Sequence, residues 1–182
     1  MSEVSDRYAI VADGFTVRIS GVPPERWDAP SPCTEWAARD LVAHVINTHW
    51  RVLAALDASD PVVVQPDDDL AAAWPSANEA IRTALADPVR AATTVGGMFG
   101  TQPFESLVGR LLCADTLIHT WDLARATGQD ESLDSGAVEQ AMEFLAPIDE
   151  AIRRPGGFAP KIVPASDADA QTRLLSFAGR TV

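Results

Sequence analysis

The stretch LVGRLLCADTLIHTWDLARATG, residues 107–128, decides the fold class. Its apolar residues recur on one half of a helical wheel, so the spacing predicts a helix over 104–127 that ends at Gly128. Asp115, His119 and Asp122 lie on that same apolar half. Because an ionised carboxylate buried without a partner costs several kcal/mol, we expect a positive partner beside these side chains.

Asp115 and His119 stand four residues apart, which places both side chains on one helical face, where they can bind one metal ion. The same spacing is common for an Asp–His hydrogen bond within a helix. A third ligand has to come from another helix, and the other histidines lie on a second predicted helix over 35–58. Periodicity favours His49, inside the apolar arc of that helix, over His44, at its edge. Spacing alone leaves both the metal and its third ligand open.

Helical patterns dominate the rest of the chain. Further helices are expected over 3–20, from the acidic run 67–69 to about 86, over 134–153 and over 169–178. Pro75 must start, kink or interrupt the third helix, and residues 93–100 (TTVGGMFG) are expected to form a loop. The sequence therefore predicts an all-α fold, with an up-down helical bundle as the simplest architecture.

Size and composition fit one globular domain over residues 1–182, with 47% hydrophobic and 22% charged residues. The net charge of −12 argues against nucleic acids and anionic membranes, which need a basic surface. No run approaches the ~20 apolar residues of a membrane span, and the N-terminus lacks the pattern of a signal peptide. We expect a cytoplasmic protein with its two cysteines, Cys33 and Cys113, reduced.

Three motifs resemble one protein family. The run SPCTEWAARDLVAHVI, residues 31–46, resembles the signature PSPC-x-x-W-x-x-RDLVAHL of the metal-binding N-terminal domain of mycothiol-dependent maleylpyruvate isomerases. The run DTLIHTWDLARATG, residues 115–128, resembles their segment E/D-x-x-x-H-x-WDLARA-x-G. The ending DAQTRLLSFAGR, residues 169–180, resembles the close of single-domain actinobacterial relatives. This resemblance implies a DinB-like four-helix bundle with a short additional C-terminal helix.

The resemblance also implies a metal site, formed by His44, Asp115 and His119. Asp122 would then orient a ligand histidine, although a hydrogen bond to an arginine or a helix end is the plainer role for it. Two histidines and one carboxylate leave coordination positions open, as a catalytic site requires. The set suits zinc, with nickel or iron as alternatives. The family's chemistry implies that the open position activates a low-molecular-weight thiol such as mycothiol, because a cation lowers the pKa of a bound thiol.

These expectations lead to three functional hypotheses. The first is a metal-dependent thiol S-transferase or isomerase that acts on a small electrophile. The alternative is a non-catalytic metal-binding or regulatory bundle, and the third is a metal-free interaction module. Maleylpyruvate isomerisation itself is not expected, since the isomerase carries an additional C-terminal domain and has Glu in the place of Asp115. Exposed helical faces rich in Ala and Trp are compatible with a homodimer.

Other residues have plainer expected roles. Cys33 could approach the site from its loop, although a small buried thiol is the plainer role for it. Trp36 and Trp121 are expected to be packing aromatics, and His49 is expected to be a buried histidine with satisfied hydrogen bonds. Ala37 stands where relatives often have a capping Thr, so the second helix is expected to begin near Thr34 or Glu35.

Overall fold

The structure is a computed structural model that describes residues 2–96, 100–153 and 157–182. Its regular structure is almost entirely helical, which confirms the predicted all-α class. In the described part of the chain the strands are β1 (Thr94–Val95) and β2 (Gln102–Pro103), which pair antiparallel. β1 falls within the loop predicted over 93–100, of which residues 97–99 lie outside the description, whereas β2 lies between this loop and the helix predicted to begin at residue 104.

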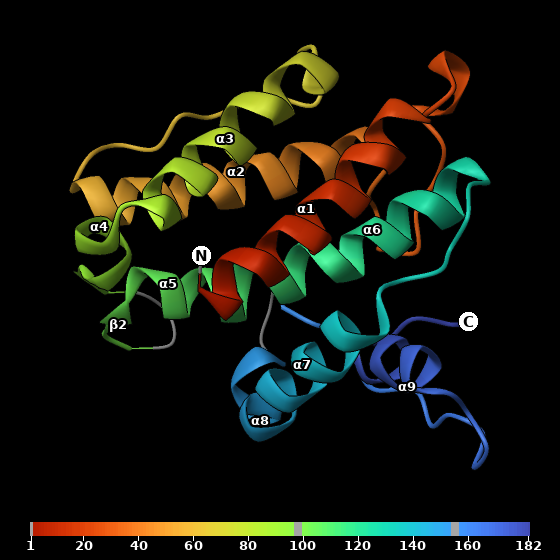
Figure 1. Cartoon of the computed structure of the whole chain (residues 1–182). Helices are drawn as coiled ribbons and strands as arrows, with labels where there is room; N and C mark the ends of the chain where they lie inside the picture. Colours follow the sequence, from red (N-terminus) through yellow and green to blue (C-terminus); the bar gives the residue numbers. More distant parts are fainter. Residues whose placement is uncertain (1, 97–99, 154–156) are drawn as a thin grey trace.

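Four long helices form the bundle (Figure 1). They are α1 (Glu3–Ser20), α2 (Ala38–Asp57), α3 (Leu70–Ala86) and α6 (Cys113–Thr127). α1 packs on α3 and α6, and α2 packs on the same two helices. The core between them contains fully buried large side chains, among them Phe15, Leu41, Trp74, Ile81 and Leu123. Among the described helices, none is both long and apolar enough to cross a membrane.

The directions of neighbouring helices differ from the simple up-down arrangement that the sequence predicted. α2 and α3 run in the same direction, so the connector of residues 58–69 returns along the bundle (Figure 1). The 20 residues of α2 span about 30 Å, and an extended connector of this size reaches roughly 40 Å. Asn47 fixes the connector, because its amide donates to the Val64 carbonyl at 2.9 Å and accepts from the Val64 N–H at 2.8 Å. A long extended connector makes the parallel pair possible.

Side-chain caps mark several helix ends where the sequence predicted them. Three aspartates each accept a hydrogen bond from the backbone N–H three residues ahead: Asp69 at α3, Asp134 at α7 (Ser135–Leu145) and Asp169 at α9 (Ala170–Phe177). Gly128 ends α6 with φ of 74°, a conformation that favours glycine. α2 begins later than expected, after Ala37, because the Asp40 carboxylate accepts from the Ala37 N–H at 2.8 Å.

Two predicted helices are not uniform. The helix over 104–127 consists of α5 (Phe104–Leu107), the π-helical turn η2 (Val108–Leu112) and α6. The helix over 134–153 is interrupted after α7 by η3 (Ala146–Ile148), because Pro147 has no N–H to continue the ladder. It resumes as α8 (Asp149–Ile152), which ends one residue before the predicted end at residue 153. α3, by contrast, passes through Pro75.

The remaining elements are short. η1 (Pro24–Arg26) follows α1, and α4 (Pro88–Ala92) follows α3. α7 packs on α6 and on α9, so that α7, α8 and α9 lie beside the four-helix bundle (Figure 1). The additional C-terminal helix predicted from the sequence is α9, and it ends next to Gly179, which has φ of 81°.

Candidate metal centre

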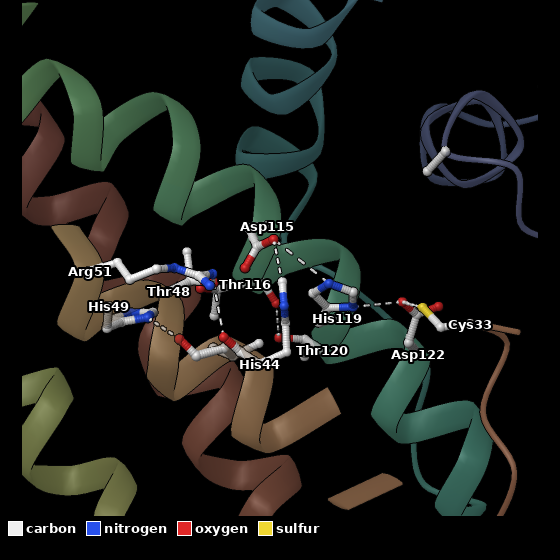
Figure 2. A network of polar contacts seen from close by, with 12 residues as sticks. Cys33, His44, Thr48, His49, Arg51, Asp115, Thr116, His119, Thr120 and Asp122 are labelled. Atoms are coloured by element: carbon white, nitrogen blue, oxygen red, sulfur yellow. Dashed lines mark hydrogen bonds and ion pairs between the residues drawn. The ribbon is translucent and has the colours of Figure 1, made fainter. Parts of the chain in front are cut away.

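Three predicted ligands meet between two helices. Figure 2 shows His44 of α2 pointing toward Asp115 and His119 of α6. His44 Nε2 lies 3.2 Å from Asp115 Oδ1, and His119 Nε2 lies 3.7 Å from the same oxygen. One ligand atom from each residue lies within 4.8 Å of the other two. Ligands bound at 2.0–2.1 Å to a tetrahedral zinc stand about 3.3 Å apart, so the cluster has the dimensions of a metal site.

Asp115 contributes a second oxygen that has no partner. Its Oδ2 is buried and forms no hydrogen bond within the described residues. Burial alone raises the pKa of Asp115, but the His44 and His119 imidazoles outweigh it and hold this pKa well below its usual range. The carboxylate is therefore ionised at neutral pH. A buried anionic oxygen without a donor is what a bound cation would satisfy.

His119 is oriented from its other side by Asp122. His119 Nδ1 lies 2.9 Å from Asp122 Oδ2, and Asp122 has no exposed surface. Burial raises the pKa of Asp122, but hydrogen bonds from Arg180 and His119 outweigh it and lower the pKa to about 2. An ionised carboxylate only accepts, so the Nδ1 atom of His119 must carry the proton. Nε2 is then the nitrogen that faces Asp115, and it is the atom that would bind a metal.

Arg180 provides, for Asp122, the positive partner that the sequence led us to expect. Its Nε donates to Asp122 Oδ1 and its Nη2 to Asp122 Oδ2, both at 2.8 Å. Both side chains are buried, with exposed fractions of 7% for Arg180 and 0% for Asp122. Asp122 thus bonds a histidine and an arginine at once, which are the two kinds of partner considered for it from the sequence. Sequence reasoning did not single out Arg180, although it lies in the resembling motif at 169–180.

Cys33 joins this network instead of being an isolated buried thiol. Its Sγ lies 3.4 Å from Asp122 Oδ2 and 2.9 Å from Arg180 Nη2 (Figure 2 shows Cys33 beside Asp122). Burial and the nearby Asp122 charge raise the pKa of Cys33 to about 12, so the thiol is protonated at neutral pH. Cys33, His119 and Asp122 also form a compact donor group. A cation there would meet the Arg180 guanidinium, so the group containing His44 and Asp115 is the better metal site.

Trp36 lines the site and is not simply a packing aromatic. Its ring centroid lies 4.9 Å from that of His44 and 6.0 Å from that of His119. The loop that carries Trp36 is closed by a bridge between Pro30 and Ala37. Trp36 and Cys33 both belong to the motif at 31–46 that resembles the family. This motif is the sequence feature that could have indicated that the loop lines the site. Trp121 is fully buried, as expected, with the Arg125 guanidinium 4.6 Å from its ring.

His49 lies elsewhere. It is fully buried, and its Nδ1 lies 2.8 Å from the Val45 carbonyl oxygen, to which it donates. Its ring packs edge-on against Trp74 at 5.0 Å, while Nε2 has no hydrogen-bond partner among the described residues. Burial lowers the pKa of His49 to about 4. Helical periodicity therefore identified a core histidine, whose hydrogen bonds are only half satisfied. Both cysteines are unpaired, and Cys113 is buried in the core.

Comparisons with known proteins identify the family of this chain. A family described as the mycothiol maleylpyruvate isomerase N-terminal domain matches residues 9–124, which include all three residues of the cluster. Two proteins of Mycobacterium tuberculosis, uncharacterized protein MT0763 of strain CDC 1551 / Oshkosh and uncharacterized protein Rv0738 of strain ATCC 25618 / H37Rv, are each 33% identical over 174 residues. The alignment covers 93% of this chain and 93% of each relative. No solved structure gives a significant match. The extent of the family match places the chain in the mycothiol maleylpyruvate isomerase N-terminal domain family.

Proposed function

We propose that this protein is a divalent-metal-dependent enzyme, an S-transferase or isomerase, that uses a low-molecular-weight thiol of the mycothiol type against a small electrophile. The observation that carries the proposal is the convergence of His44, Asp115 and His119, with a buried carboxylate oxygen that has no donor among the residues the structure describes. Zinc is the proposed metal, because two imidazoles and one carboxylate are a common catalytic zinc set. The family assignment supports a mycothiol-type thiol.

The donor set leaves room for a substrate. Three protein ligands keep at least one position of a four-coordinate metal open, and a cation there would lower the pKa of a bound thiol so that it reacts as a thiolate. His44 and Asp115 have exposed side-chain fractions of 27% and 15%, so the cluster is reached from solvent on their side. Trp36 offers an apolar wall beside the imidazoles. The three ligand residues would hold the metal and thereby orient the thiol, while Trp36 would exclude water from one side of the thiol.

Metal analysis tests the first half of the proposal. We expect about one zinc per chain in the purified wild-type protein and essentially none in a double variant with His44→Ala and His119→Ala. His49→Gln is the matched control, because it removes a histidine from the same helix but outside the cluster, and it should keep its zinc. Absence of zinc, nickel and iron from wild-type protein after metal loading would leave only a hydrogen-bonded polar cluster.

A thiol-transfer assay tests the second half. Mycothiol and a panel of small α,β-unsaturated carbonyl compounds and alkyl halides are incubated with metal-loaded protein, metal-free protein and the double variant. Thiol consumption should be accelerated only by the metal-loaded wild type. Normal metal binding without acceleration for any member of the panel would favour the non-catalytic metal-binding bundle. The thiol, the metal and the homodimer stay predictions.

A further inference from the structure

The end of the chain returns to the candidate metal centre. After α9, Gly179 adopts φ of 81°, and a Cβ at that position would lie 2.7 Å from the Ala159 Cβ. The turn there therefore requires glycine. The next residue, Arg180, donates its backbone N–H to the Leu175 carbonyl at 2.8 Å, and its Nη1 donates to the Ala178 carbonyl at 2.8 Å. These bonds fix both the backbone and the guanidinium of Arg180 before it reaches the bundle.

The guanidinium then engages Asp122 with two parallel bonds. Nε and Nη2 each donate to a different carboxylate oxygen at 2.8 Å, a bidentate geometry that only arginine provides. Nη2 also lies 2.9 Å from the Cys33 Sγ. Because both Asp122 oxygens are held, the lone pair that faces His119 Nδ1 has a fixed direction. Asp122 without this partner would be a buried carboxylate free to rotate or to take up a proton.

We propose that Arg180 is a positioning residue of the metal centre, which acts through Asp122 to fix the ring of His119 with Nε2 toward the metal. The effect of Arg180 on metal binding rests on the proposed function, whereas its effect on the orientation of His119 does not. Arg180 lies beyond residues 9–124, which the family matches. The C-terminal segment would therefore contribute to a site whose proposed ligands come from α2 and α6. A purely structural Arg180 would only attach α9 to the bundle.

Three variants separate these roles. Arg180→Gln removes the charge, and Arg180→Lys keeps the charge but cannot form the bidentate pair. Arg173→Gln removes an exposed arginine from α9, the helix that precedes Arg180. Zinc affinity is measured by competition with a chromophoric chelator. We expect Arg180→Gln to lose about 10- to 100-fold in affinity, the usual effect of removing a partner of a metal-bound histidine. Arg180→Lys should fall in between, and Arg173→Gln should match the wild type.

Nuclear magnetic resonance of metal-free protein gives a second readout that does not depend on zinc. In the wild type, the His119 Nδ1–H should give a downfield, slowly exchanging proton signal, because Asp122 accepts it in a buried site. That signal should be lost in Arg180→Gln and retained in Arg173→Gln. A variant that melts at a lower temperature but keeps both this signal and wild-type zinc affinity would overturn the inference in favour of a structural role.

The remaining outcomes also decide the matter. If Arg180→Gln does not fold, Arg180→Lys carries the test, and wild-type values for both its affinity and its proton signal would overturn the inference. If the wild type binds no zinc, the proposed function fails, while the proton signal of metal-free protein still decides whether Arg180 fixes His119.

Discussion

His119 Nδ1 and Asp122 Oδ2 are 2.9 Å apart in a part of the structure where Asp122 has no exposed surface. Because Asp115 lies on the Nε2 side of the same ring, two carboxylates of one helix flank a single imidazole. Asp122 fixes the tautomer, and Asp115 offers an ionised oxygen beside the free nitrogen. This division explains how two acids can lie on one apolar helical face.

Asp115 variants should separate charge from size. Asp115→Asn removes the anionic oxygen. Zinc affinity should then fall by more than about 100-fold, because loss of a hydrogen-bond partner of a ligand already lowers affinity by about 10- to 100-fold. Asp115→Glu should retain zinc, because a longer carboxylate still reaches the imidazoles of His44 and His119. Isothermal titration with zinc checks both variants. Equal affinities for the Asn variant and the wild type would exclude Asp115 as a ligand.

Removal of the Asp122 charge should destabilise the fold as well as the site. Asp122→Asn leaves the buried Arg180 guanidinium unpaired, and the free energy of unfolding should drop by about 3–5 kcal/mol. Urea denaturation of metal-free protein measures this. Asp130→Asn breaks the exposed ion pair with Arg18 and serves as control, with little expected change. Equally small effects in both variants would mean that the buried pair contributes no more than a surface one.

Acid should destabilise the protein through His49. The pKa of His49 is about 4 in the folded chain against 6.5 for the free side chain, so the unfolded state binds a proton that the folded state rejects between these values. Stability is therefore full above pH 6.5 and is lost as pH falls toward 4, by about 3 kcal/mol in total. Urea denaturation with chelator present should show this slope in the wild type and a flatter one in His49→Gln. Parallel slopes in the two proteins would contradict the assignment of this acid destabilisation to His49.

Trp36 should report metal binding by fluorescence. Its ring lies 4.9 Å from that of His44, so a paramagnetic ion such as Ni²⁺ in the cluster should quench its emission efficiently. The chain has five tryptophans, and most of the Ni²⁺-dependent quenching should disappear in Trp36→Phe while it persists in Trp50→Phe. Equal loss in both variants would indicate that the ion binds elsewhere.

The sequence predicted the helices better than their order. Caps such as Asp69 and Asp169, together with Gly128, are local signals, and the corresponding helix ends lie where they were expected. The parallel pair α2 and α3 could not be predicted, because it depends on how the connector pairs with Asn47 across the bundle. Pro147 lies inside the helix predicted over 134–153 and is a local signal for its interruption, which the prediction missed.

The residues of the candidate site also divide into those that a local sequence pattern indicates and those that only the fold brings together. Asp115 and His119 are neighbours on one helix, so their spacing identified them. Periodicity pointed to His49 because it selects the most buried residue, whereas a site that admits a substrate needs a residue at the edge of the apolar arc, as His44 is. Arg180 and Cys33 approach Asp122 from 58 and 89 residues away, and no local pattern encodes such contacts.

X-ray absorption at the zinc edge of zinc-loaded protein, without added thiol, tests the central claim most directly. The cluster predicts two imidazole nitrogens and carboxylate or water oxygen at about 2.0–2.1 Å, with no sulfur neighbour. In the double variant with His44→Ala and His119→Ala the imidazole scattering should vanish with the bound zinc. A sulfur shell at about 2.3 Å would instead place the ion at Cys33 and contradict the site built from His44, Asp115 and His119.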